Sequence, residues 1–158
     1  MIPPLLRISK LTDYGTVLLA YLAARQSIVC SAAEAAAATG ISLPTTSKLL
    51  KALSRSGIIT STRGSNGGYR LYKNPSKISA TDIIDAIEGS ISITECCTSG
   101  SQCEYEGACN VSDAWQRVNI AIRSALDDVS LSDLLRTNNS TSHFRFADLP
   151  ITVRSEKR

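Results

Sequence analysis

The stretch that decides the fold is residues 41–71, ISLPTTSKLLKALSRSGIITSTRGSNGGYRL. Ser42 suits the N-cap of a helix, Pro44 falls in its first turn, where a missing N–H group is tolerated, and Gly57 marks its end. The apolar residues between them recur at helical spacing: Leu49, Leu50 and Leu53. The stretch therefore begins with a helix that buries one face.

The second half of this stretch predicts a β-hairpin. Residues 58–62 and 69–72 are rich in β-branched and aromatic residues, and residues 63–68 between them are nearly all turn formers. The glycine-rich turn lacks a following Gly-Lys-Ser/Thr and does not lead into a helix, which argues against a nucleotide-binding loop.

Two shorter helices are predicted before this stretch. Thr12 is the expected N-cap of the first, which ends near Arg25. Ser31 and Glu34 form a capping box for an alanine-rich second helix that stops at Gly40. Two helices joined by a tight glycine turn resemble a helix-turn-helix, and the hairpin adds the wing of a winged helix.

The helical pattern returns after the hairpin. Ser79 and Asp82 form a capping box for a helix that Gly89 ends, and residues 130–135 predict one further capped turn. Between them, apolar residues recur every three or four positions: Trp115, Val118, Ile122, Ala125 and Val129. They predict a long helix, and because the winged-helix core is already covered by its own helices, this one should pack partly against a second subunit.

The expected fold is therefore mainly α with a small β-hairpin wing: a winged helix-turn-helix plus a long dimerisation helix. We divide the chain into a DNA-binding domain at residues 1–78, a cysteine-bearing loop with the dimerisation helix at 79–136, and a flexible tail at 137–158. At 158 residues the chain can bury one core.

Residues 95–115 hold four of the five cysteines in a polar segment that suits a loop. Cys97, Cys103 and Cys109 are spaced six residues apart, and Cys96 stands beside the first. Disulfides are disfavoured because no secretion signal is evident, whereas structural zinc, an iron–sulfur cluster and free thiols all remain open.

The candidate DNA contacts lie on the third helix and the hairpin. The expected exposed residues of that helix are small polar groups and cations, as a major-groove reader requires: Thr45, Thr46, Ser47, Lys48 and Lys51. Arg63 and Arg70 flank the hairpin tip, and Arg7 and Lys10 can add backbone contacts. The plainer interpretation is an ordinary solvated surface.

Overall charge and hydropathy set weaker limits. The net charge of +3 and the pI near 8.7 permit a nucleic-acid partner without requiring one. Residues 1–6 lack a basic leader region, and the apolar run at 15–24 is too short to span a bilayer. We therefore expect a cytoplasmic protein that does not enter a membrane.

In the order of its elements, the chain resembles the iron–sulfur-sensing winged-helix repressors typified by IscR and NsrR. Residues 41–71, the three evenly spaced cysteines and the long Trp-bearing helix carry this resemblance, which covers residues 7 to about 135. The opening LRISKLTDYGTVLLAYLA, residues 6–23, resembles the branch that regulates SUF-type cluster assembly operons. The resemblance implies a non-enzymatic homodimer that binds a palindromic operator and holds one cluster per subunit near the dimer interface.

The resemblance leaves one cluster ligand to be found. The IscR pattern has a histidine three residues after the last cysteine, but this chain has Ser112, and its only histidine, His143, lies in the predicted tail. Asp13 matches the NsrR pattern, in which an aspartate reaches across the dimer, so we predict it as the fourth ligand of the partner's cluster, with Cys96 as the alternative. A 2Fe–2S cluster is favoured over 4Fe–4S. The competing function is a zinc-stabilised or cluster-free winged helix that binds a partner protein.

Overall fold

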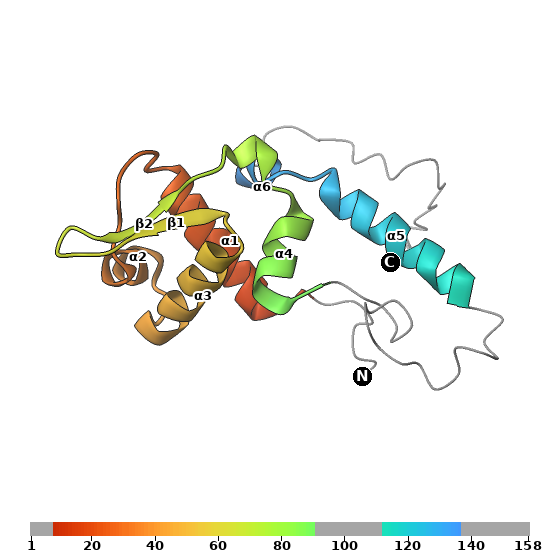
Figure 1. Cartoon of the computed structure of the whole chain (residues 1–158), viewed down its shortest axis with the longest axis horizontal. Helices are drawn as coiled ribbons and strands as arrows, with labels where there is room; N and C mark the ends of the chain where they lie inside the picture. Colours follow the sequence, from red (N-terminus) through yellow and green to blue (C-terminus); the bar gives the residue numbers. More distant parts are fainter. Residues whose placement is uncertain (1–7, 91–111, 137–158) are drawn as a thin grey trace, which may run out of the picture.

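The computed structural model describes residues 8–90 and 112–136 (Figure 1). Along the chain the elements are α1 (Lys10–Ala23), α2 (Ala32–Thr39), α3 (Leu43–Arg55), β1 (Ile59–Thr62), β2 (Gly68–Leu71), the 3-10 helix η1 (Pro75–Lys77), α4 (Ala80–Glu88), α5 (Ser112–Asp127) and α6 (Leu131–Leu135). A mainly helical fold with a two-stranded hairpin confirms the predicted fold class. No helix in the described ranges combines the length and apolar character that a membrane span requires.

Helix α1 begins one turn earlier than its sequence predicts. Its N-cap is Ser9, whose side-chain oxygen accepts hydrogen bonds from the backbone N–H groups of Leu11 and Thr12. Thr12 is 4% exposed, and its hydroxyl donates to a carboxylate oxygen of Glu88, at the end of α4. The prediction of Thr12 as N-cap is therefore wrong, because a long-range partner holds the hydroxyl that would have capped the helix.

The other predicted helix ends are mostly confirmed. The capping boxes of α2, α4 and α6 are all present, and Gly40 ends α2 in the left-handed conformation with φ 73°. Ser42 is the N-cap residue of α3, but its hydroxyl donates to Thr45 Oγ1 and caps no backbone group. Helix α3 therefore depends on its buried face more than on its first turn.

The core forms around α1, which crosses the middle of the molecule and contacts α2, α3 and α4 (Figure 1). The leucines of the predicted α3 stripe are buried against leucines of α1: Leu49, Leu50 and Leu53 against Leu18, Leu19 and Leu22. Helices α1 and α4 approach closely at Gly15, where an added Cβ atom would lie 2.2 Å from Ile87 Cδ1. A larger residue at this crossing would require the Ile87 side chain to move.

The hairpin is fixed to the core at its base. β1 and β2 pair antiparallel, with Ile59 opposite Leu71, and the backbone of Cys30 adds a further bridge to Tyr69 through hydrogen bonds of 2.9 and 2.8 Å. An added Cβ atom at Gly68 would lie 2.5 Å from the Cys30 carbonyl oxygen. A single bridge therefore ties the chain between α1 and α2 to the base of the hairpin.

The C-terminal helices join the same core. The Leu131 N–H group donates to the Ile78 carbonyl at 2.7 Å, and the Ala80 N–H group donates to the Val129 carbonyl at 2.8 Å. Ile78, Ile83 and Leu131 are all buried in one cluster with the leucines of α1 and α3. The domain division that we predict after residue 78 therefore falls within a continuous hydrophobic core, from which α5 extends outward (Figure 1).

Candidate nucleic-acid interface and cluster ligands

Helix α3 separates the predicted DNA contacts into exposed and buried groups. Lys48 and Lys51 are exposed, and Thr45 and Ser47 are half-buried. Thr46 is 0% exposed, and its hydroxyl donates to the Ile41 carbonyl at 3.4 Å. The prediction that Thr46 lies on the exposed face is wrong, because this residue belongs to the buried leucine stripe.

One exposed residue of α3 does not appear among the predicted contacts. Leu43, the first residue of the helix, is 49% exposed. It stands seven positions before Leu50, so helical periodicity alone places it on the buried stripe. Its position in the first turn beside Pro44 is the available signal that the core does not cover it.

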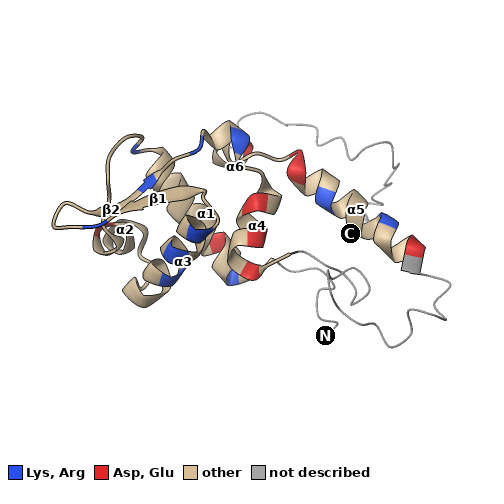
Figure 2. Cartoon of the chain, in the orientation of Figure 1, with Lys and Arg blue, Asp and Glu red and all other residues tan. Residues whose placement is uncertain are grey.

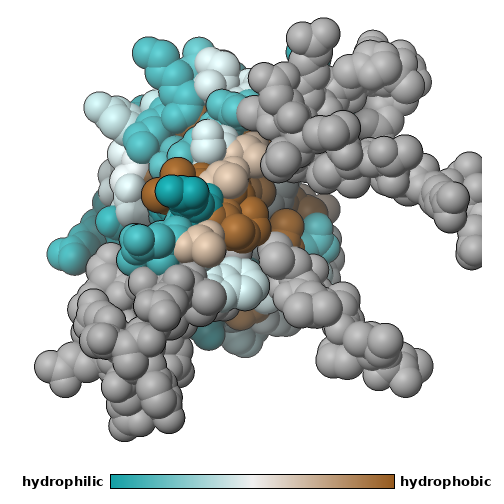
Figure 3. Space-filling view, turned by 90° about the vertical axis from the view of Figure 1, so that its right-hand side faces the viewer, coloured by the Kyte–Doolittle hydropathy of each residue, from teal (hydrophilic) through white to brown (hydrophobic). Residues whose placement is uncertain are grey.

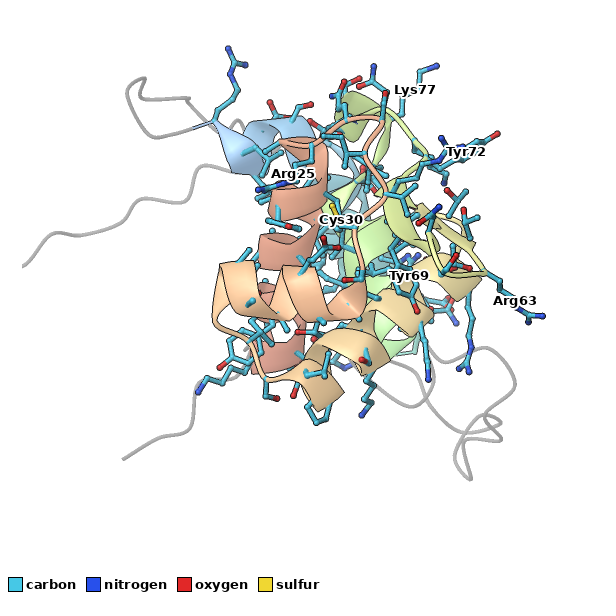
Figure 4. The ribbon with its side chains drawn as sticks, turned by 90° about the vertical axis from the view of Figure 1, so that its left-hand side faces the viewer. Arg25, Cys30, Arg63, Tyr69, Tyr72 and Lys77 are labelled. Carbon is cyan, nitrogen blue, oxygen red and sulfur yellow. The ribbon has the colours of Figure 1, made fainter. Side chains whose placement is uncertain are left out.

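The hairpin carries two of the predicted contacts, Arg63 and Arg70, which are both exposed but have different neighbours. Arg63 follows β1 and projects away from the body at the hairpin tip (Figure 4). Arg70 lies within β2 opposite Thr60, and its Nε–H donates to Thr60 Oγ1 at 3.4 Å. Lys10, on α1, is exposed with its Nζ atom 5.8 Å from the Tyr14 ring centroid. Arg63 is therefore the arginine placed to reach a groove or phosphate outside the body.

Charge is strongly segregated along the chain. Between Glu34 and Asp82 there is no acidic residue, and seven basic residues occur: Lys48, Lys51, Arg55, Arg63, Arg70, Lys73 and Lys77. Basic residues accordingly mark α3 and the hairpin, whereas acidic residues mark α4 (Figure 2). This segregation is readable in the sequence, and it is a stronger indication of a polyanion partner than the net charge.

Of the predicted cluster ligands, the structure describes only Asp13. It lies in the first turn of α1, is exposed, and accepts no hydrogen bond from any described residue. Cys96, Cys97, Cys103 and Cys109 lie outside the described residues, and the described ranges bring together no group of three metal-binding side chains. Three thiolates and one exposed carboxylate are a donor set that fits iron. Cys30 is buried beneath the hairpin and contributes to the core.

Helix α5 exposes apolar side chains on the outer part of the molecule. Trp115, Val118 and Ile120 are 43%, 42% and 66% exposed. The end-on view shows apolar side chains gathered in the middle of this face (Figure 3). Asn119 is buried, and its Oδ1 atom has no hydrogen-bond partner among the described residues.

One ion pair fixes the direction of α5 relative to α4. Arg123 Nη2 lies 2.8 Å from Asp85 Oδ2, and its Nη1 atom donates to Asp85 Oδ1 and to Ser90 at 3.3 Å. The hydrogen bonds to the Asp85 carboxylate raise the pKa of Arg123 above its ordinary value. This forked contact holds the middle of α5 while its apolar side chains remain exposed.

Comparison with known proteins places this geometry in a family. The family model "Rrf2: Iron-dependent Transcriptional regulator" matches residues 8–137. Protein aau3 of Rhizobium meliloti (strain 1021) is 30% identical over 132 residues, which cover 83% of this chain and 86% of that protein.

Two solved structures have similar folds. CymR (YrzC), the global cysteine regulator of B. subtilis, is 30% identical with a TM-score of 0.61, covering 82% of this chain and 96% of CymR. T. potens IscR is 28% identical with a TM-score of 0.59, covering 82% of this chain and 86% of IscR. Because the family model spans most of the chain, including the winged helix and α5, the chain belongs to the Rrf2 family of transcriptional regulators.

Proposed function

We propose that this regulator is a cytoplasmic homodimer that binds a palindromic operator on double-stranded DNA and represses iron–sulfur cluster assembly genes according to the state of a bound cluster. The observation that carries the DNA part is the acid-free, seven-cation segment between Glu34 and Asp82. Lysine and arginine there replace counterions along the phosphate backbone, which supplies most of the affinity for DNA.

The described residues suggest how the contacts divide. Ser47 and Thr45, near the start of α3, present hydroxyls to base edges, while Lys48 and Lys51 lie on exposed positions suited to phosphate. Arg63 at the hairpin tip reaches a neighbouring groove or the backbone. Thr46 is buried behind α3 and would make no contact with DNA.

The cluster part rests on the donor set. Cys97, Cys103 and Cys109 would hold the cluster, with Asp13 of the partner subunit as fourth ligand and Cys96 as the alternative. When bound, the cluster would supply a centre that is lost when iron is scarce or when an oxidant attacks it. The family description names iron and one similar structure is IscR, whereas CymR is named for cysteine, so the support for a cluster comes from the cysteines of this chain.

A cluster shared across the dimer would act on DNA through geometry. A carboxylate is a weaker ligand for iron than a thiolate, so Asp13 is the ligand most easily released. Its release would break the link between the partner's cluster and α1, around which the core of each winged helix is built. Cluster state would then bias the spacing of the two α3 helices, a two-state mechanism that links occupancy to operator affinity.

The cluster is tested by anaerobic purification with visible absorbance, iron and sulfide analysis. We expect a coloured protein from which Cys103→Ala removes most of the iron, while Cys30→Ala, the matched control beneath the hairpin, retains it. Asp13→Ala should shorten the cluster lifetime more than Cys96→Ala does. A colourless protein with stoichiometric zinc contradicts the proposal and favours the zinc-stabilised module.

The DNA part is tested by operator titration at several salt concentrations. Arg63→Ala should weaken binding and reduce the slope of log K against log salt by about one unit, because one phosphate contact is lost. Arg136→Ala is the matched control, since this exposed arginine follows α6 and lies outside the seven-cation segment. Equal behaviour of the two variants would remove the hairpin tip from the contact surface.

A further inference from the structure

The start of α1 and the end of α4 are joined by one carboxylate. The Ser9 N–H group donates to Glu88 Oε1 at 3.2 Å, and the Thr12 hydroxyl donates to the same oxygen. One turn further along α1, Gly15 lies against the Ile87 side chain, and an added Cβ atom would lie 2.2 Å from Ile87 Cδ1. The contact is therefore a close helix crossing secured at its edge by a charged acceptor.

The Glu88 carboxylate suits this position electrostatically. It lies at the N-terminal end of α1, where unpaired N–H groups favour a negative charge. The hydrogen bond from Thr12 lowers the pKa of Glu88 most, the hydrogen bonds from Ser9 lower it further, and burial opposes them by raising it. The ionised form, which accepts both hydrogen bonds, is therefore the one that the contact stabilises.

The two ends of this contact adjoin the predicted cluster ligands. Thr12 precedes Asp13 in the chain, and Glu88 is the last residue of α4, a few residues before the cysteine-bearing stretch. We propose that Glu88 is a positioning residue: it holds the first turn of α1 against α4 and thereby sets where Asp13 is presented to the partner subunit. The role of Asp13 rests on the proposed function, whereas the contact by which Glu88 restrains α1 does not depend on it.

A local helix cap would not have this consequence. Glu34 also closes the start of a helix, but its partner Ser31 is three residues away within α2. Glu88 and Thr12 are 76 residues apart, so their contact restrains two helices relative to each other. Glu34→Gln is therefore a matched control, which removes the same charge from a helix start that carries no predicted ligand.

The first measurement is amide hydrogen exchange in the metal-free protein. Glu88→Ala, and Glu88→Gln as the variant of similar volume, should speed exchange of the amides of residues 9–13 by about fivefold, the factor expected for one net hydrogen bond. Glu34→Gln should leave those amides unchanged. Unchanged exchange in both Glu88 variants overturns the hold on α1.

The second measurement is a double-mutant cycle on cluster lifetime against a chelator. Glu88→Gln should shorten the lifetime in the wild-type background and have no further effect in Asp13→Ala, because it acts through Asp13. Equal fold-changes in both backgrounds overturn the positioning role. A wild-type chain that binds no iron refutes the proposed function and with it the role of Asp13, while the exchange measurement still decides whether Glu88 holds α1.

Discussion

Helices α3 and α5 show the same amphipathic pattern and different packing. Beyond its first turn, the leucines of α3 are 0–1% exposed, whereas Trp115, Val118 and Ile120 of α5 are 42–66% exposed. Periodicity thus identifies both helices, but it does not say what covers the apolar side. For α3 the covering partner is α1 of the same chain, and for α5 a second copy of the chain is the partner we propose.

The largest expected effect is on the free energy of unfolding, for a substitution among the buried leucines of α3. Leu50→Ala should lower the free energy of unfolding by about 2–5 kcal/mol, because it opens a cavity among the leucines of α1 and α3. Leu43→Ala, at the exposed start of the same helix, should change it by less than about 0.5 kcal/mol. Urea unfolding of the metal-free protein measures both. Similar losses in the two variants would mean that α3 is covered along its whole length.

The second-largest effect is expected for the exposed apolar residues of α5. Ile120→Asp should raise the dimer dissociation constant at least about tenfold, equivalent to ~1.4 kcal/mol, because it places an unpaired charge in the apolar interface. Ser76→Asp adds the same charge at an exposed position outside α5 and is the control. Sedimentation velocity at several concentrations gives the constants. A wild-type chain that is monomeric at all of them would leave α5 without its proposed partner.

The smallest effect is expected at the start of α2, where a capping box contributes to stability and the helix buries little. Hydrogen bonds from the Ser31 backbone and hydroxyl lower the pKa of Glu34 below its ordinary value of 4.5. A depressed folded-state pKa contributes stability above the unfolded pKa, and this contribution is lost as pH falls through the folded value. Glu34→Gln should therefore destabilise the protein slightly at neutral pH and have no effect in acid.

Ser42→Ala completes this test on α3. Because Ser42 caps no backbone group, its removal should leave urea unfolding unchanged at either pH. A clear loss of stability in Ser42→Ala would show that α3 depends on its first turn as α2 does, and would weaken the contrast between the two helix starts.

Local patterns predicted most of the fold. Two capping boxes, a further capped turn, the glycine stop at Gly40 and the hairpin follow from residues near one another in the sequence, and the structure confirms them. Thr46 was also accessible to such reasoning, since it stands three and seven positions before Leu49 and Leu53 on the buried stripe. The contact between Thr12 and Glu88 was not, because no local rule relates residues so distant in sequence.

The candidate site shows the same difference between features set by local sequence and features set by contacts between distant residues. The residue types suited to DNA could be read from α3 and the hairpin, since exposure there follows from helix and strand periodicity. Which of them reach outward required the structure, which separates Arg63 from Arg70 and Lys48 from Thr46. The cluster ligands depend on how distant segments meet, so the choice between Asp13 and Cys96 as fourth ligand does not follow from cysteine spacing.

The base of the hairpin restricts which residue types fit, whereas its tip can accept additional residues. Added Cβ atoms at Gly67 and Gly68 would lie 2.3 Å from the Thr62 carbonyl oxygen and 2.5 Å from that of Cys30, while Ser65 and Asn66 are exposed. Residues inserted between Ser65 and Asn66 would extend the loop into solvent without disturbing the bridge to Cys30. The reach of this arm across a groove can therefore diverge between relatives through loop length alone, while the helices that support it stay the same.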